Sequence, residues 1–194
     1  NFFDLQFEGT IILLILGYFL YLTIGINIFF NILILSFGAI FYFYNKKKIP
    51  KIEIKKILLL FFLFFSVLII SKTHEDFNGY HFFSINEVFN NKLRIGVSNL
   101  NERFFHSSHL ILNQALTVFP FFNFKFIHLP AYIIYISTIG YFIFLAFSKE
   151  TIGNELFFAI FCIFVLLVKF NRLSEFGYDY IGQFILLVVF HKIY

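Results

Sequence analysis

The stretch from Gly9 to Tyr44 contains no charged residue, and no other feature constrains the fold as strongly. A helix rises about 1.5 Å per residue and the hydrocarbon core of a bilayer is about 30 Å thick, so the stretch is too long for one ordinary membrane-spanning helix. It is just long enough for two short ones. Because Asn27 and Asn31 lie in its middle, we predict a helical hairpin of residues 10–26 and 28–44. One long tilted helix is the alternative.

The composition is that of a chain surrounded by lipid. Hydrophobic residues make up 60% of the 194 residues and charged residues only 13%, against about 25% in soluble domains. The net charge of +4 is concentrated in a Lys-rich loop, so it bears on membrane orientation, and we expect no nucleic-acid partner. The sequence predicts an all-α, multi-pass transmembrane bundle with about five to six spans.

We expect three regions along the chain. Residues 1–71 hold the hairpin at 10–44, a cytoplasmic Lys-rich loop at 45–56 and a span at 57–71. Residues 72–125 form an external loop that is partly helical. Within it, Ser84 to Glu87 resembles a capping box, and residues 110–124 form an interfacial helix. Residues 126–194 hold further spans at 126–147 and 156–168, a second polar motif at 171–183 and a cut-off span.

The ends and the cysteine give two further expectations. The chain begins with Asn1, contains no Met and stops within an apolar run, so we expect a fragment of a longer protein, or one trimmed at both ends. The lone Cys162 lies in an apolar run and is expected to be a small buried hydrophobe.

Orientation follows from the lysines. Loops rich in Lys remain on the cytoplasmic side, so the segment after the 57–71 span lies outside. The second polar motif lies on the same outer face if residues 110–124 do not cross the membrane. If they cross fully, that motif moves to the cytoplasm.

Residues 74–81 contain the strongest candidate for chemistry. Two adjacent carboxylates, Glu75 and Asp76, lie between His74 and His81 just outside a predicted span. Neighbouring side chains diverge by about 100° on a helix, so one carboxylate would act as base or metal ligand and the other as its structural partner. We choose Asp76 as the acting group because its side chain is shorter. The alternative is a solvated loop start in which Lys72 pairs with a neighbouring acid.

Two more histidines suggest a metal. His106 and His109 have the i, i+3 spacing that places both imidazoles on one helical face, where they could bind a divalent ion with Asp76 or Glu75. No HExxH motif or cysteine pair accompanies them, so ordinary loop histidines or acid–base helpers are favoured. The sequence indicates no definite cofactor beyond this candidate metal.

The outer loops also contain bases and a second acid pair. Lys72, Arg94, Arg103 and Arg172 could bind a lipid phosphate, and interfacial snorkelling is the alternative. Glu175, Asp179 and Gln183 are spaced by four and could form a polar stripe on one helical face. Acids at a helix N-terminus are the alternative explanation of this spacing.

Taken together, these motifs resemble the GT-C class of membrane glycosyltransferases, in which several spans precede a short acidic motif in the first large external loop. More narrowly, residues 74–81, 96–101, 106–108 and 175–183 are similar to segments of poorly characterised bacterial multi-pass proteins linked to envelope polysaccharide synthesis. The resemblance covers residues 10–183.

The resemblance implies an inverting transfer from a polyprenyl-phosphate sugar on the external face of a bacterial cytoplasmic membrane. Asp76 or Glu75 would orient or deprotonate the acceptor hydroxyl, His74 and His81 would assist, and basic loop residues would hold the departing phosphate. Membrane lipid and the lipid-linked sugar are the implied partners. A role in substrate binding for Glu175 and Asp179 is not part of the GT-C pattern and rests on placement.

Two other classes of protein remain open. In a transporter or flippase, Glu175, Asp179 and His128 would line a translocation path. In a structural subunit of a larger membrane complex, the polar loop would be an interface.

Overall fold

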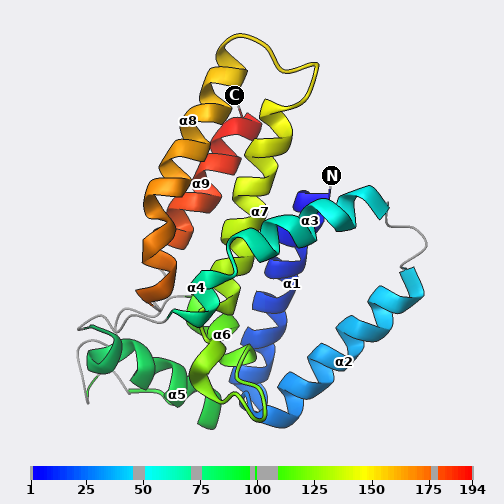
Figure 1. Ribbon diagram of the computed structural model, residues 1–194. Coiled ribbons are helices and arrows are strands. Elements are labelled where there is room, and N and C mark those ends of the chain that lie inside the picture. The colour runs from blue at the N-terminus through cyan, green and yellow to red at the C-terminus, as the bar shows by residue number, and fades with distance from the viewer. Residues whose placement is uncertain are drawn as a thin grey trace.

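The computed structural model describes residues 2–45, 51–70, 76–96, 99, 109–175 and 179–193. All regular elements in these ranges are helical, which confirms the predicted all-α bundle (Figure 1). They are α1 (Phe2–Thr23), α2 (Ile28–Asn45), α3 (Lys51–Leu63), α4 (Ser66–Ile69), η1 (Phe77–His81), α5 (Phe82–Asn90), α6 (His109–Leu116), η4 (Phe124–Phe126), α7 (Leu129–Ala146), α8 (Asn154–Lys169), η5 (Phe170–Glu175) and α9 (Asp179–Ile193).

Four helical segments are long and apolar enough to cross a membrane. They are Phe3–Thr23, Ile28–Asn45, Phe124–Ala146 and Asn154–Glu175, and Tyr180–Ile193 is a shorter apolar helix. These segments support a membrane protein. The count of five to six spans stays a prediction, and so does the expectation that the chain is a fragment of a longer protein.

α1 and α2 are two separate helices, but they do not pack together as a hairpin. Gly25 has a φ of +92°, and its N–H donates to the Leu20 carbonyl at 2.7 Å, which ends α1. Asn27 Oδ1 accepts hydrogen bonds from the N–H groups of Phe29 and Phe30 at 3.0 and 3.2 Å and starts α2. Figure 1 shows α2 diverging from α1, and α2 packs closely against no other helix in the described ranges.

α7 is the central helix and packs against α1, α3, α8 and α9. Gly140 permits the closest approach, because a Cβ at this position would lie 2.4 Å from Cε1 of Phe3. The Tyr135 hydroxyl donates to the Leu166 carbonyl of α8 at 3.2 Å, so this buried polar group is satisfied. Cys162 on α8 is fully buried, as expected for a small hydrophobe.

The segment expected to span the membrane at residues 57–71 is not a single helix, and its crossing stays a prediction. α3 ends at Leu63, and a turn at residues 64–65 separates it from the one-turn helix α4. α3 has 13 residues and is about 20 Å long, short of the hydrocarbon core. It crosses α7 (Figure 1), and Lys56 Nζ lies 4.2 Å from the ring centroid of Phe144, a favourable cation–π distance.

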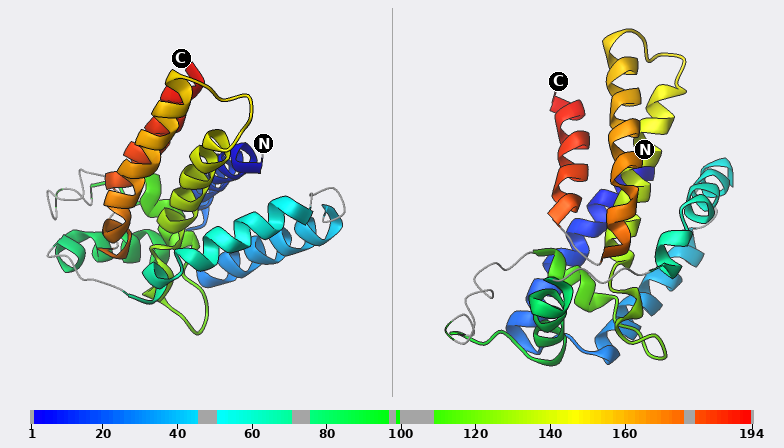
Figure 2. Two further views of the ribbon diagram at one scale, coloured as in Figure 1. Left: turned by 45° about the horizontal axis from the view of Figure 1, so that its top comes forward. Right: turned by 60° about the vertical axis from the view of Figure 1, so that its left-hand side comes forward.

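α5 and α6 pack on each other at one end of the bundle, where α6 also contacts α1 (Figures 1 and 2). α6 has 8 residues, about 12 Å, so the 110–124 segment does not cross the bilayer as one helix. The prediction of a capping box at Ser84 is wrong. Helical turns begin before it at η1, so Ser84 is buried inside α5.

Candidate functional site

The acidic motif begins a helical turn of rare geometry. Asp76 directly precedes η1, a π-helical turn in which the Phe82 N–H donates to the carbonyl of Phe77, five residues earlier. π turns are uncommon and occur frequently at functional sites. Asp76 is half-buried, and Glu75 and His74 lie outside the described residues.

His81 ends this π turn, and its side chain is only 4% exposed. Histidine changes its charge near neutral pH, so a buried imidazole beside a carboxylate segment can take part in proton transfer. Within the described part of the motif, Asp76 and His81 are therefore the two titratable side chains that could share acid–base work.

Aromatic contacts hold this segment against the bundle. The ring centroids of Phe82 and Phe124 are 5.0 Å apart, and those of Phe89 and Phe124 are 5.8 Å apart. Both pairs are edge-on, a favoured arrangement. Beyond α5, the Leu93 N–H donates to the Tyr21 carbonyl of α1 at 2.9 Å. α5 is thus fixed at both ends, which gives the π turn a rigid support.

The second polar segment lies at the same end of the bundle. α4, which leads into the acidic motif, packs against η5 (Figure 2). The predicted polar stripe does not form on one helix, because Glu175 ends the 3-10 turn η5 whereas Asp179 begins α9. Asp179 and Gln183 share α9, and Gln183 is exposed.

Both arginines that the structure describes pair with carboxylates. Arg172 Nη1 lies 2.8 Å from Glu175 Oε2, and Arg94 Nε lies 3.6 Å from Glu87 Oε1. The arginine side chains are 55% and 60% exposed, so each pair stabilises the fold by about 0–1 kcal/mol. A phosphate could therefore displace either carboxylate at low cost. Lys72 and Arg103 lie outside the described residues.

The metal prediction falls largely outside the described side chains. His106 is not among the described residues, and only the backbone of His109 is described, as the first residue of α6. Among the side chains that are described, no group of three His, Cys, Asp or Glu residues could hold a metal ion.

A polar cluster that the sequence did not suggest joins four helices at the opposite end. The Tyr141 hydroxyl lies 2.8 Å from His191 Nδ1, and His191 Nε2 lies 3.2 Å from Glu155 Oε1. Lys192 pairs with Asp4. The cluster connects α7, α8, α9 and α1. In the sequence these residues are only isolated polar groups near helix ends.

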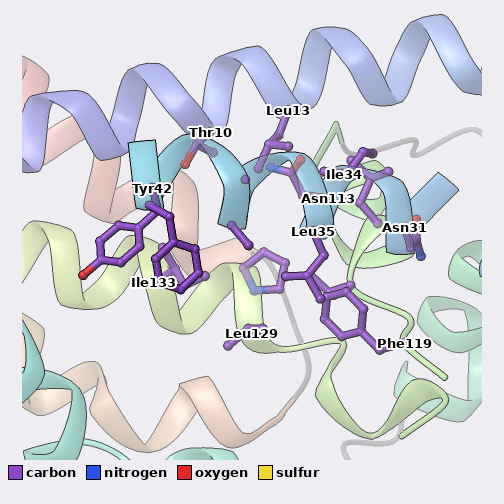
Figure 3. A pocket seen from close by; sticks show the side chains of 16 residues that line it. Thr10, Leu13, Asn31, Ile34, Leu35, Tyr42, Asn113, Phe119, Leu129 and Ile133 are labelled. Carbon is purple, nitrogen blue, oxygen red and sulfur yellow. The ribbon is translucent and has the colours of Figure 1, made fainter. Parts of the chain in front are cut away.

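A cavity of about 470 Å³ lies between α2 and the helices α1, α6 and α7 (Figure 3). No charged residue in the described part of the chain lines it, and most of its wall is apolar. Asn31 and Asn113 contribute polar side chains, and both are buried. The sequence singled out these two residues only as interruptions of apolar runs.

No protein-family model matches the sequence, and neither a curated protein nor a solved structure matches it. The interpretation of the site therefore rests on its own geometry and chemistry.

Proposed function

We propose that this chain is a membrane glycosyltransferase-like protein that transfers a sugar from a lipid-phosphate donor at the end of the bundle that holds Asp76. Asp76 is the base or orienting carboxylate, Glu75 its partner, and His74 and His81 assist. The proposal includes the external face of a bacterial cytoplasmic membrane and a role in cell-envelope glycan synthesis, both of which rest on the resemblance in sequence.

In the proposed reaction, the acceptor hydroxyl gives its proton to the Asp76 carboxylate while its oxygen attacks the anomeric carbon of the sugar. The bond from that carbon to the phosphate oxygen breaks, and the lipid phosphate leaves with the electron pair. Attack opposite the leaving group inverts the anomeric centre. A general base must lie within hydrogen-bond reach of this hydroxyl, which requires that Asp76 be held in place. The π turn and the aromatic contacts of α5 supply that support.

The observation that supports the proposal most is a contact, at one end of the apolar bundle, between the helix that precedes the acidic motif and the second polar segment. α4 leads into the Asp76 turn and packs against η5, which holds Arg172 and Glu175. A substrate anchored in lipid presents its polar head at such an end. There the carboxylate of Asp76 and the buried imidazole of His81 come from one turn, and the guanidinium of Arg172, which is 55% exposed and pairs with Glu175, comes from a distant part of the chain.

Asp76→Asn tests the proposal. The amide keeps the shape of the side chain but cannot accept the proton, so transfer should fall by about 100-fold or more. The measurement uses the chain in proteoliposomes, with a panel of polyprenyl-phosphate sugars radiolabelled in the sugar and membrane glycan as acceptor. Glu150→Gln is the matched control, because Glu150 is exposed in the loop after α7, at the other end of the bundle. Unchanged transfer by Asp76→Asn would refute the assignment.

A transporter or flippase is the second candidate, and one observation favours it. His128 is 1% exposed and lies within the candidate span Phe124–Ala146. Ionisable residues inside membrane segments often mark translocation paths. In the same proteoliposomes, movement of the labelled lipid across the bilayer without any transfer product would favour this candidate.

A further inference from the structure

The cavity beside α2 lies among helices that are suited to cross a membrane. α1, α2 and α7 each belong to a candidate span, and all three line it. Its volume of about 470 Å³ is in the usual range for small-molecule sites, about 300–1,000 Å³. If these helices cross a membrane, hydrocarbon surrounds the cavity, and an empty void would deprive the wall atoms of dispersion contacts. A lipid chain is the available molecule that fits such a wall.

The cavity exists because α2 stands away from the bundle and presents small residues to it. Gly38 and Ala39 line the space, and a Cβ added at Gly38 would meet no atom within 4 Å. Figure 3 shows Tyr42 towards one end of the cavity and Asn31 towards the other. The cavity therefore follows the length of α2, as an extended chain would.

Two buried amide oxygens in residues of the wall have no hydrogen-bond donor among the described residues. They are Oδ1 of Asn31 and Oδ1 of Asn113. The orientation of Asn31 is fixed, because its Nδ2 donates to the carbonyls of Ala115 and Val118, both at 2.8 Å. Its oxygen is thus an acceptor. An unsatisfied buried acceptor costs about 1–3 kcal/mol, which a donor on a ligand would recover.

The same wall disfavours a phosphate. No Lys, Arg or His that the structure describes lines the cavity, so a phosphate there would meet acceptor oxygens without a compensating cation. A hydroxyl is neutral and can donate. The site is therefore chemically different from the lipid-phosphate site of the proposed transferase and does not depend on it.

We propose that this cavity binds a neutral single-chain lipid that bears a hydroxyl group, such as a long-chain alcohol or a monoacylglycerol. The chain lies along α2 beside Gly38 and Tyr42, and the hydroxyl donates to Oδ1 of Asn113 after a small adjustment of that side chain.

The test uses a long-chain alcohol with a photoactivatable group in its chain, together with the matched hydrocarbon and alkyl phosphate. The chain in lipid nanodiscs is irradiated with each probe, and labelled peptides are identified by mass spectrometry. Peptides of α2 and α6 should be labelled about 2- to 10-fold more by the alcohol than by the hydrocarbon, as expected for one hydrogen bond. Asn113→Leu should remove this preference.

Gly38→Leu should reduce alcohol labelling by about 10-fold or more, because Gly38 lines the cavity and a Cβ there meets no atom within 4 Å, so a larger side chain can take up space that the lipid chain needs. Gly182→Leu on α9 is the matched control, since a Cβ there also meets no atom within 4 Å and Gly182 does not line the cavity. The proposal is overturned if Gly38→Leu labels like the unchanged chain. It is also overturned if the hydrocarbon or the alkyl phosphate labels α2 and α6 as well as the alcohol does. Sugar transfer is measured in a separate experiment. The labelling results therefore test lipid binding even if the chain transfers no sugar.

Discussion

At the scale of single residues, Asn31 shows how one polar group positions a helix. Its Nδ2 donates to two carbonyls near the end of α6, although it lies in an otherwise apolar helix. Since α2 packs closely against no other helix among the described residues, these two hydrogen bonds are a large share of what holds it in place. Hydrogen bonds between helices in lipid contribute about 0.6–2 kcal/mol each.

Asn31→Ala should therefore lower the free energy of unfolding by about 1–3 kcal/mol, because it leaves two buried carbonyls without that donor. The measurement is an SDS titration in mixed micelles, followed by helix content. Asn45→Ala is the control on the same helix, since Asn45 Nδ2 donates only to the exposed Phe41 carbonyl within α2. Equal stability of the two variants would show that Asn31 does not tie α2 to the bundle.

At the scale of elements, the cluster around His191 holds helix ends together. A neutral imidazole satisfies both neighbours, because Nδ1 accepts from the Tyr141 hydroxyl while Nε2–H donates to Glu155. His191 also stacks on Phe158 of α8, with ring centroids 6.1 Å apart and an interplanar angle of 14°. α9 is short, so these contacts fix its final turn against α7 and α8.

His191→Leu should destabilise the chain by about 1–3 kcal/mol, because it leaves Tyr141 and Glu155 without their shared partner. Tyr141→Phe removes one of these bonds and should cost less. The double variant combines His191→Leu with Tyr141→Phe. If the two side chains act together, its loss in free energy of unfolding should be smaller than the sum of the two single losses, by about 0.5 kcal/mol or more in the same unfolding titration. Strict additivity would show that the Tyr141–His191 contact has no energetic weight.

At the scale of the whole molecule, the bundle has two chemically different ends. Antiparallel α7 and α8 place the loop at Glu150 at one end, together with the His191 cluster (Figures 1 and 2). The π turn at Asp76 and the η5 turn lie at the other. If α7 and α8 cross the bilayer, these two ends face different compartments.

Cysteine labelling tests this arrangement. Asn78→Cys in the π turn and Glu150→Cys should react with a membrane-impermeant maleimide from opposite sides of sealed vesicles, because both positions are exposed. The native Cys162 is fully buried and should stay unreactive. Labelling of the unchanged chain, which contains only this cysteine, is the control. If residues 57–71 cross the bilayer, the Lys-rich loop predicts that position 78 is labelled from outside. Labelling of both positions from one side would contradict the antiparallel crossing of α7 and α8.

Local signals in the sequence predicted well where a helix begins and ends. Gly25 and Asn27 interrupt the first uncharged stretch, and the structure uses them as the end of α1 and the start of α2. The same kind of reasoning did not predict the turn at residues 64–65 within an apolar run, and it failed at Ser84, because the π turn begins the helix earlier.

The candidate site was predictable only in part. Asp76 and His81 stand out in the sequence because two acids and two histidines gather beside an apolar run. Nothing local indicates that α4 and η5 meet, or that Asn31 finds partners 84 and 87 residues along the chain. Such pairings depend on how helix surfaces fit together.

The apolar composition alone predicts a bundle of helices, because in lipid every backbone N–H and C=O must be bonded within its own segment. Which helix stands apart, where the cavity lies and which polar residues share an end depend on how the helices pack. α1 and α2 are apolar on nearly all faces, so they have no polar side to indicate which face turns inward. Side-chain shape, as in the contact of Phe3 with Gly140, makes that choice.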